Sequence, residues 1–144
     1  MQSLSDSLST QLSASFASDN DPELIRQAVP FSLKLIESLM AENPHDDGLL
    51  YSAAKGFTQY AYAFLQQDAD EIEDRDSVQA SALRQRAAKL YLRARDYGMQ
   101  ALEQHHWNRR RTAEALRISY RSLMYKMKSC DIRNGIEVRR SMAQ

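Results

Sequence analysis

Residues 103–133 read EQHHWNRRRTAEALRISYRSLMYKMKSCDIR, and this stretch predicts two short amphipathic helices joined by a tight turn. The first helix should run over about 109–117, with Ala113 and Leu116 on one face. Ser119 is a good N-cap for the second helix, because its hydroxyl can accept a hydrogen bond from an otherwise unpaired backbone N–H. Two short helices joined in this way form a helix-turn-helix.

The second helix separates apolar residues from polar ones. Leu123 and Met127 are four residues apart and should face inward. The outward face carries hydroxyls and cations, which are Arg121, Ser122, Tyr125, Lys126 and Lys128. A helix-turn-helix whose second helix is cationic is typical of proteins that read DNA.

The same stretch resembles the Fis-type helix-turn-helix that ends NtrC-type activators. The matching residues are Ala101-Leu102, Asn108, Ala113, Leu116, Ile118-Ser119, Arg121, Ser122, Leu123 and Lys126. Arg117 stands where that family usually has a turn glycine, and an Arg in the left-handed region costs about 1 kcal/mol. Met124-Tyr125 is a second departure, since some members place a cation there.

The resemblance implies a transcriptional regulator that binds double-stranded DNA sequence-specifically, as a homo-oligomer, most simply a dimer. The second helix would enter the major groove with Ser119, Tyr120, Arg121, Ser122 and Tyr125 nearest the bases. Arg121 would contact guanine, because its guanidinium matches the O6 and N7 acceptors. Phosphates would be held by Asn108, Arg109, Arg110, Arg111, Lys126 and Lys128.

The distribution of charge supports a division of the chain into two parts. The 144 residues carry 19 Lys and Arg against 19 Asp and Glu, so the net charge is zero. Residues 1–102 nevertheless hold 9 cations against 15 acids, whereas residues 103–144 hold 10 against 4. A basic block joined to an acidic one suggests a phosphate-binding end and a separate body. The alternative is a solvated basic face without a partner.

Helical spacing of apolar residues predicts the first half of the body. A thin amphipathic helix should carry Leu4, Leu8, Leu12 and Phe16. Asp21-Pro22 is typical of a helix start, and the next stripe is Leu24, Ala28, Phe31, Leu35 and Leu39. Pro30 should kink or split this helix near Val29.

Two further helices complete the body. The segment from Gly48 predicts a buried helix, with the stripe Leu49, Ala53, Phe57, Tyr60 and Phe64. The acidic residues 68–76 should form a solvated loop, and Asp76-Ser77 should cap a long helix with the stripe Leu83, Ala87, Leu90, Ala94, Tyr97 and Leu102. No strand-like alternation is present, so the fold class is all-α. The expected core is Leu35, Phe57, Tyr60, Phe64, Leu90 and Leu102.

Residues from about Leu4 to Leu102 resemble a second family, the TatT component associated with TRAP transporters. Its members are helical-hairpin proteins related to tetratricopeptide repeats. The matching segments are FASDNDPELIRQAVPFSLKLIESLMAENP (16–44), GLLYSAAKGFTQYAYAFLQQDAD (48–70) and RAAKLYLRARDYGMQALE (86–103). The two resemblances imply a chimeric arrangement: a TatT-like body at 1–102 and a Fis-type unit at 96–144, which share a long helix at about 77–105. A natural fusion, an assembly artefact and a designed chimera all fit this arrangement.

Binding rather than catalysis is the expected function. No phosphate loop, nucleophile elbow or paired Cys is present, so we expect no enzyme activity, cofactor or metal. His105 and His106 are adjacent and point about 100° apart on a helix, which prevents them from clamping one metal ion. No apolar run reaches about 18 residues, so no membrane insertion is expected. The N-terminus lacks a signal-peptide pattern, which favours the cytoplasm; a signal upstream of Met1 would favour the periplasm instead.

Two alternatives to DNA binding remain open. The first is a binding or scaffold protein of a TRAP transport system, with concave hairpin surfaces lined by Tyr51, Tyr60, Tyr62 and Tyr91. The second is a structural helical oligomer with a basic tail.

Overall fold

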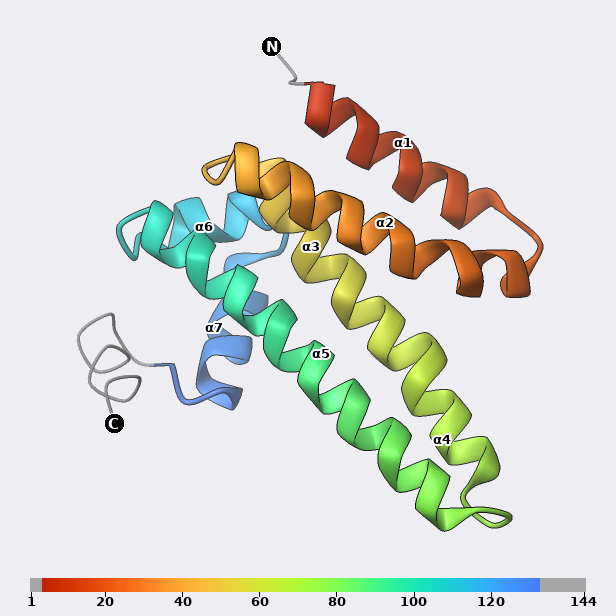
Figure 1. Ribbon diagram of the computed structural model, residues 1–144. Coiled ribbons are helices and arrows are strands. Elements are labelled where there is room, and N and C mark those ends of the chain that lie inside the picture. Colours follow the sequence, from red (N-terminus) through yellow and green to blue (C-terminus); the bar gives the residue numbers. More distant parts are fainter. Residues whose placement is uncertain (1–3, 133–144) are drawn as a thin grey trace.

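The structure is a computed structural model that describes residues 4–132, and this part of the chain is built from helices without strands (Figure 1). In chain order the elements are α1 Leu4–Ser18, α2 Pro22–Glu42, α3 Asp47–Tyr60, the π-helix η1 Ala61–Gln66, α4 Gln67–Ile72, α5 Ser77–Gln104, α6 Arg109–Ala115 and α7 Tyr120–Ser129. The predicted all-α class is confirmed for the described residues.

A long hairpin forms the centre of the fold. One arm is the continuous run α3, η1 and α4, and the other is α5, which returns alongside it (Figure 1). Helix α2 packs on α3, and α1 lies next to α2 at the outside. Helices α6 and α7 follow at the end of α5, close to the start of α3.

The hairpin core follows the predicted stripes. Leu49, Ala53 and Phe57 of α3 are buried, and so are Ala87 and Ala94 of α5. The rings of Phe57 and Tyr97 stack across the hairpin with their centroids 5.9 Å apart. Of the six predicted core residues, three are buried (Phe57, Tyr60 and Leu102) and three are partly buried (Leu35, Phe64 and Leu90).

The predicted apolar face of α2 is wrong by about one residue. Leu33 and Ile36 face the core, whereas Phe31 of the predicted stripe is 73% exposed. A second apolar stripe, Ile25, Val29, Leu33, Ile36 and Met40, lies next to the predicted one, so the spacing alone does not decide between the two. Gly56 of α3 helps to decide the packing, because the missing side chain leaves room for Leu33. Helix α2 also runs through Pro30 as one element and is not split.

The acidic segment is more ordered than predicted. Residues 61–66 form a π-helix, and α4 then extends the helix to Ile72, where a solvated loop was expected. Arg26 of α2 binds Asp68 with two hydrogen bonds of 2.5 and 3.1 Å. Arg84 of α5 binds Asp70 at 2.9 Å and Glu73 at 2.6 Å. These two arginines offset the repulsion among the acids, which allows the segment to remain helical.

Three helices end in a left-handed residue that is not glycine. His106, Arg117 and Asp131 follow α5, α6 and α7, and each has φ of 53°. After α6, the N–H of Ile118 donates to the carbonyl of Ala113 at 3.0 Å, the long hydrogen bond of a Schellman motif. Arg117 therefore has the left-handed backbone that a turn glycine would adopt.

Helices α6 and α7 pack on the end of α5 through a small apolar cluster. Leu102, Ala113, Leu123 and Met127 are its buried members. Leu116 instead belongs to the larger hairpin core, and Ile118 touches both groups. The division into 1–102 and 96–144 around a shared helix remains a prediction.

Trp107 also packs on this second cluster. Its indole Nε1 is buried and has no acceptor among the described residues, although its N–H was expected at the rim.

Candidate binding grooves

Helix α3 separates two grooves, and the four tyrosines predicted to line concave hairpin surfaces are divided between them. Tyr51 and Tyr91 line a groove between α3, α5 and the α6–α7 region, which we call the C-terminal groove. Tyr60 and Tyr62 line a groove between α1, α2, α3 and η1, which we call the N-terminal groove.

The C-terminal groove has a volume of about 610 Å³ and an apolar floor. Ala94, Gly98 and Leu102 contribute one wall from α5. Leu123 and Met127 line the groove from α7. A Cβ added at Gly98 would meet no atom within 4 Å, so this glycine leaves space in the groove rather than allowing two helices to touch.

Four cations line the same groove, from four different elements. They are Lys55 of α3, Arg95 of α5, Arg117 of the turn and Lys126 of α7. Among the described residues that line this groove there is no Asp or Glu. A concave site with one sign of charge concentrates the field and attracts ligands of the opposite sign.

Tyr51 organises two of these cations. The guanidinium carbon of Arg117 lies 4.5 Å from the centroid of the Tyr51 ring. Lys55 Nζ lies 5.5 Å from that centroid and 3.2 Å from the Tyr51 hydroxyl. Both distances fall within the range of cation–π attraction. The side chain of Arg117 is thus held against the Tyr51 ring.

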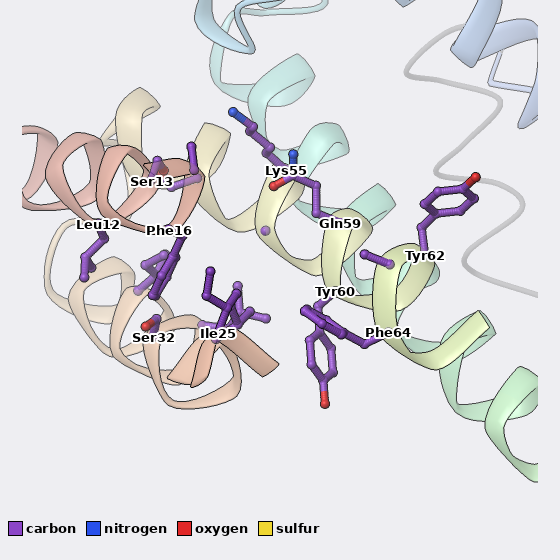
Figure 2. Close-up of a pocket in the computed structure, with 17 residues that line it drawn as sticks. Leu12, Ser13, Phe16, Ile25, Ser32, Lys55, Gln59, Tyr60, Tyr62 and Phe64 are labelled. Atoms are coloured by element: carbon purple, nitrogen blue, oxygen red, sulfur yellow. The ribbon is translucent and has the colours of Figure 1, made fainter. Parts of the chain in front are cut away.

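The N-terminal groove is smaller, at about 480 Å³, and mostly apolar. Leu12 and Phe16 of α1 project toward α2, where Ile25 lies near Phe64 (Figure 2). Tyr62 points away from the other lining side chains (Figure 2), and it is 57% exposed. This groove lies beneath α1 and carries a single cation, Lys55, at its edge.

A polar contact fixes the end of α5 against the start of α3. Gln104 Nε2 donates to Asp47 Oδ1 at 2.6 Å, and His105 Nε2 lies 2.9 Å from the same oxygen. The contact holds the end of α5 next to the beginning of α3, and Tyr51 lies one turn farther along α3.

A second polar contact joins α2 to α5 in the hairpin. The hydroxyl of Tyr97 donates to Glu37, and burial together with this hydrogen bond raises the pKa of Tyr97. Burial would by itself raise the pKa of Glu37. Hydrogen bonds from Tyr97 and Lys34 and the charge of Arg93 outweigh it, so the pKa of Glu37 is lowered.

The residues predicted to contact DNA take several different positions. Asn108 is the N-cap of α6 and accepts from the backbone N–H of Arg111 at 3.1 Å. Ser119 is the N-cap of α7, as predicted, and accepts from the N–H of Ser122 at 3.0 Å. Both side chains therefore act as N-caps.

The predicted cations also differ in their surroundings. Arg110 lies 5.7 Å from the ring centroid of Tyr120, and Arg109 Nη1 lies 3.7 Å from the sulfur of Met124. Lys126 lines the C-terminal groove. The remaining predicted contacts that are exposed are Arg111, Arg121, Tyr125 and Lys128.

A comparison with protein families decides between the two resemblances. The model of the TRAP transporter T-component matches residues 18–134, from the end of α1 to beyond α7. The chain belongs to the TRAP transporter T-component family. An uncharacterized protein of Treponema pallidum (strain Nichols) is 33% identical over 88 residues, which are 61% of this chain. The chain spans about a quarter (27%) of that relative's length. No solved structure matches the chain.

The T-component match corrects the predicted function. It runs through α6 and α7, so these helices lie within the region that the family model describes, and the resemblance to a Fis-type unit finds no support. DNA binding, transcription regulation and double-stranded DNA as partner are therefore wrong. The dimer was inferred from DNA half-sites and loses its basis. The misleading pattern is local, because capped helices and a tight turn are set by neighbouring residues.

The structure adds one observation on membranes. Within residues 4–132, no helix combines the length and the apolar character that crossing a bilayer requires.

Proposed function

We propose that this T-component is a binding and scaffold protein of a TRAP transport system, and that the C-terminal groove is its binding surface. The observation that carries the proposal is that the lining residues of the groove fall within the region matched by the family model. Every residue lining this groove lies between Tyr51 and Ile132, inside the region of the family match. The groove therefore belongs to the part of the chain that the family model describes.

The chemistry of the groove is suited to recognition. An apolar floor stabilises a bound group by removing its apolar surface from water. Polar groups at the edge then fix the orientation of that group and provide specificity. Tyr51 and Tyr91 supply apolar ring surface together with a hydroxyl, a combination that is frequent in binding surfaces.

We also propose the periplasm as the location, in place of the cytoplasm predicted first. The reason is membership of the T-component family, because a component of a transport system has to lie on the same side of the membrane as the components that it contacts. The partners in this proposal are proteins of the transporter.

Co-purification tests this function. The tagged chain is co-expressed with the components of a TRAP transporter from the same organism, and bound components are identified by mass spectrometry. Gly98→Phe should place a ring in the groove without a backbone clash, because a Cβ at this position meets no atom within 4 Å. Gln100→Phe is the matched control, since it adds the same ring to an exposed position on α5 outside the groove.

The expected result is a complex with the unmodified chain and with Gln100→Phe, and a weaker complex with Gly98→Phe. Failure of the folded, unmodified chain to retain any transporter component would contradict the proposed function. Equal retention by all three proteins would mean that the partner uses another surface.

A further inference from the structure

We propose that one face of the α6–α7 region docks on a bilayer surface that carries anionic phospholipid headgroups. This face, which we call the cationic face, consists of Arg110, Tyr120, Arg121, Tyr125 and Lys128, all of them exposed. None of these residues lines the C-terminal groove. The inference goes beyond the proposed function, because neither the groove nor a transporter protein takes part in it.

Helix α7 presents most of the cationic face. Leu123 and Met127 are buried on its inner side. Arg121, Tyr125 and Lys128 follow one another at intervals of four and three residues, so they lie on one side of the helix. Tyr125 has 72% of its surface exposed. This side of α7 therefore presents two cations and an aromatic ring to the surroundings of the protein.

Helix α6 extends the cationic face through one aromatic contact. The guanidinium carbon of Arg110 lies 5.7 Å from the ring centroid of Tyr120, the first residue of α7, which is within the range of cation–π attraction. Within residues 4–132, no ion pair joins Arg110, Arg121 or Lys128 to an acid. Their charges are therefore available to an external partner.

The sign of the charge selects an anionic partner. Residues 108–130 contain seven Lys and Arg against one acid, Glu114. Each Lys or Arg close to an anionic bilayer strengthens binding about fivefold. Three such residues on one face are enough for a reversible attachment that depends on the salt concentration.

The acidic segment at 68–76 lies too far away to cancel this attraction. Its six Asp and Glu precede the start of α5, at the far end of the hairpin from α6 (Figure 1). The part of α5 that borders the same groove as α7 begins at Tyr91, 14 residues after Ser77, which corresponds to about 21 Å of helix. Charge interactions are screened over about 8 Å at physiological salt. An anionic surface would therefore attract the α6–α7 end and leave the acidic end directed away.

The two tyrosines favour a bilayer over an acidic protein surface. A tyrosine ring has an apolar body and a polar tip, and tyrosine is enriched at the headgroup level of membranes. Tyr120 and Tyr125 are exposed next to the cations, so their rings can enter the headgroup layer while Arg121 and Lys128 meet phosphates. A protein surface that is only acidic would pair with the cations and offer these rings no apolar region.

Flotation with lipid vesicles tests the proposal on the full chain. Vesicles of phosphatidylcholine with phosphatidylglycerol are the anionic probe, and vesicles of phosphatidylcholine alone are the neutral one. The informative variant combines Arg121→Gln with Lys128→Gln, because Gln retains helix propensity while two charges leave the face. Arg86→Gln with Lys89→Gln is the matched control, since it removes two exposed charges from α5 outside the face. Circular dichroism verifies that each variant is folded.

A second pair of variants tests the contribution of the rings. Tyr125→Ser removes an exposed ring from the cationic face. Tyr62→Ser is its control, because Tyr62 is 57% exposed and lies in η1, outside the face.

We expect the unmodified chain to float with the anionic vesicles and not with the neutral ones, and added salt should weaken the binding. Loss of two cations should make the Arg121 and Lys128 double variant bind about 25-fold more weakly. The Arg86 and Lys89 control should bind like the unmodified chain. Tyr125→Ser should bind several-fold more weakly, whereas Tyr62→Ser should not.

Three results would overturn the proposal. The folded chain could fail to float with anionic vesicles, or it could float equally with both kinds. The control pair on α5 could also lose as much binding as the pair on the face, and the attraction would then follow net charge rather than this face. If the double variant on the face loses a transporter component in co-purification while the unmodified chain does not float, the face docks on an acidic protein instead. A chain that floats as predicted but retains no component removes the proposed function alone.

Discussion

Two glycines in the same hairpin should respond in opposite ways to the same substitution. A Cβ added at Gly56 of α3 would lie 2.5 Å from Leu33 Cδ2, a distance that forces an atom to move. Leu33 is buried against α3, with 4% of its surface exposed. A Cβ added at Gly98 of α5 would meet nothing within 4 Å. Gly56→Ala and Gly98→Ala therefore bring the same gain in helix propensity. Only Gly56→Ala also introduces a packing clash.

The magnitudes follow from these two terms. Replacing Gly by Ala inside a helix stabilises it by about 0.5–1 kcal/mol. Gly98→Ala should show this gain alone. Overpacking a core costs about 1–3 kcal/mol, which equals or exceeds the gain. Gly56→Ala should therefore lower the free energy of unfolding by up to about 2 kcal/mol, which is the overpacking cost less roughly 1 kcal/mol gained in helix propensity.

Urea denaturation followed by circular dichroism measures both effects. The clash is isolated by repeating Gly56→Ala in a Leu33→Ala background, where the methyl group that obstructs the new Cβ is absent. In that background Gly56→Ala should stabilise by about 0.5–1 kcal/mol, as at an unobstructed helix position. If Gly56→Ala stabilises the otherwise unmodified chain, or still destabilises it without the Leu33 side chain, the packing of α2 on α3 described above is wrong.

Three further predictions concern stability. Because the folded pKa of Glu37 is below its ordinary value of 4.5, its stabilisation is present above that pH and is lost as the pH falls through the lowered pKa. Glu37→Gln should therefore cost about 1–3 kcal/mol at pH 7, and urea melts should show the difference narrowing below pH 4.5; a constant difference at all pH values would contradict it. His106→Gly should raise the free energy of unfolding by about 0.5–1 kcal/mol in urea melts, since it removes a left-handed non-glycine residue, and a loss would contradict this. If α5 is shared by the hairpin and the α6–α7 region, Leu116→Ala should cost about 2–5 kcal/mol and leave one cooperative transition by circular dichroism and Trp107 fluorescence, whereas two separate transitions would refute the sharing.

Much of the hairpin core was predictable from the helical spacing of apolar residues. The spacing on α3 and α5 was enough to select Phe57 and Leu102 as buried. Helix α2 carries two neighbouring apolar stripes, and the choice between them depends on Gly56, which lies in another helix. Local chemistry also placed the N-cap at Ser119, because a cap depends on near neighbours.

The C-terminal groove could be predicted only in part. Tyr51 and Tyr91 were assigned to a concave surface, and they do share one groove. The grouping of Lys55, Arg95 and Arg117 was missed, because these cations come from separate elements and only the fold brings them together. Lys126 was assigned to DNA contact because its helix has a cationic outer face. Sequence alone does not reveal that this lysine also borders a groove. The signal that was available is Gly98, a glycine within a long helix that leaves an open space.

Hydrogen–deuterium exchange on the unmodified chain, with and without the components of a TRAP transporter, tests the central claim most directly. Binding at the C-terminal groove predicts slower exchange in peptides from residues 51–59, 91–102 and 116–127, which contain most of its lining residues. Residues 22–31 at the start of α2 lie outside this groove and should exchange unchanged. Slower exchange confined to α1 and α2, or no change anywhere at saturating component, would contradict the claim that this groove is the binding surface.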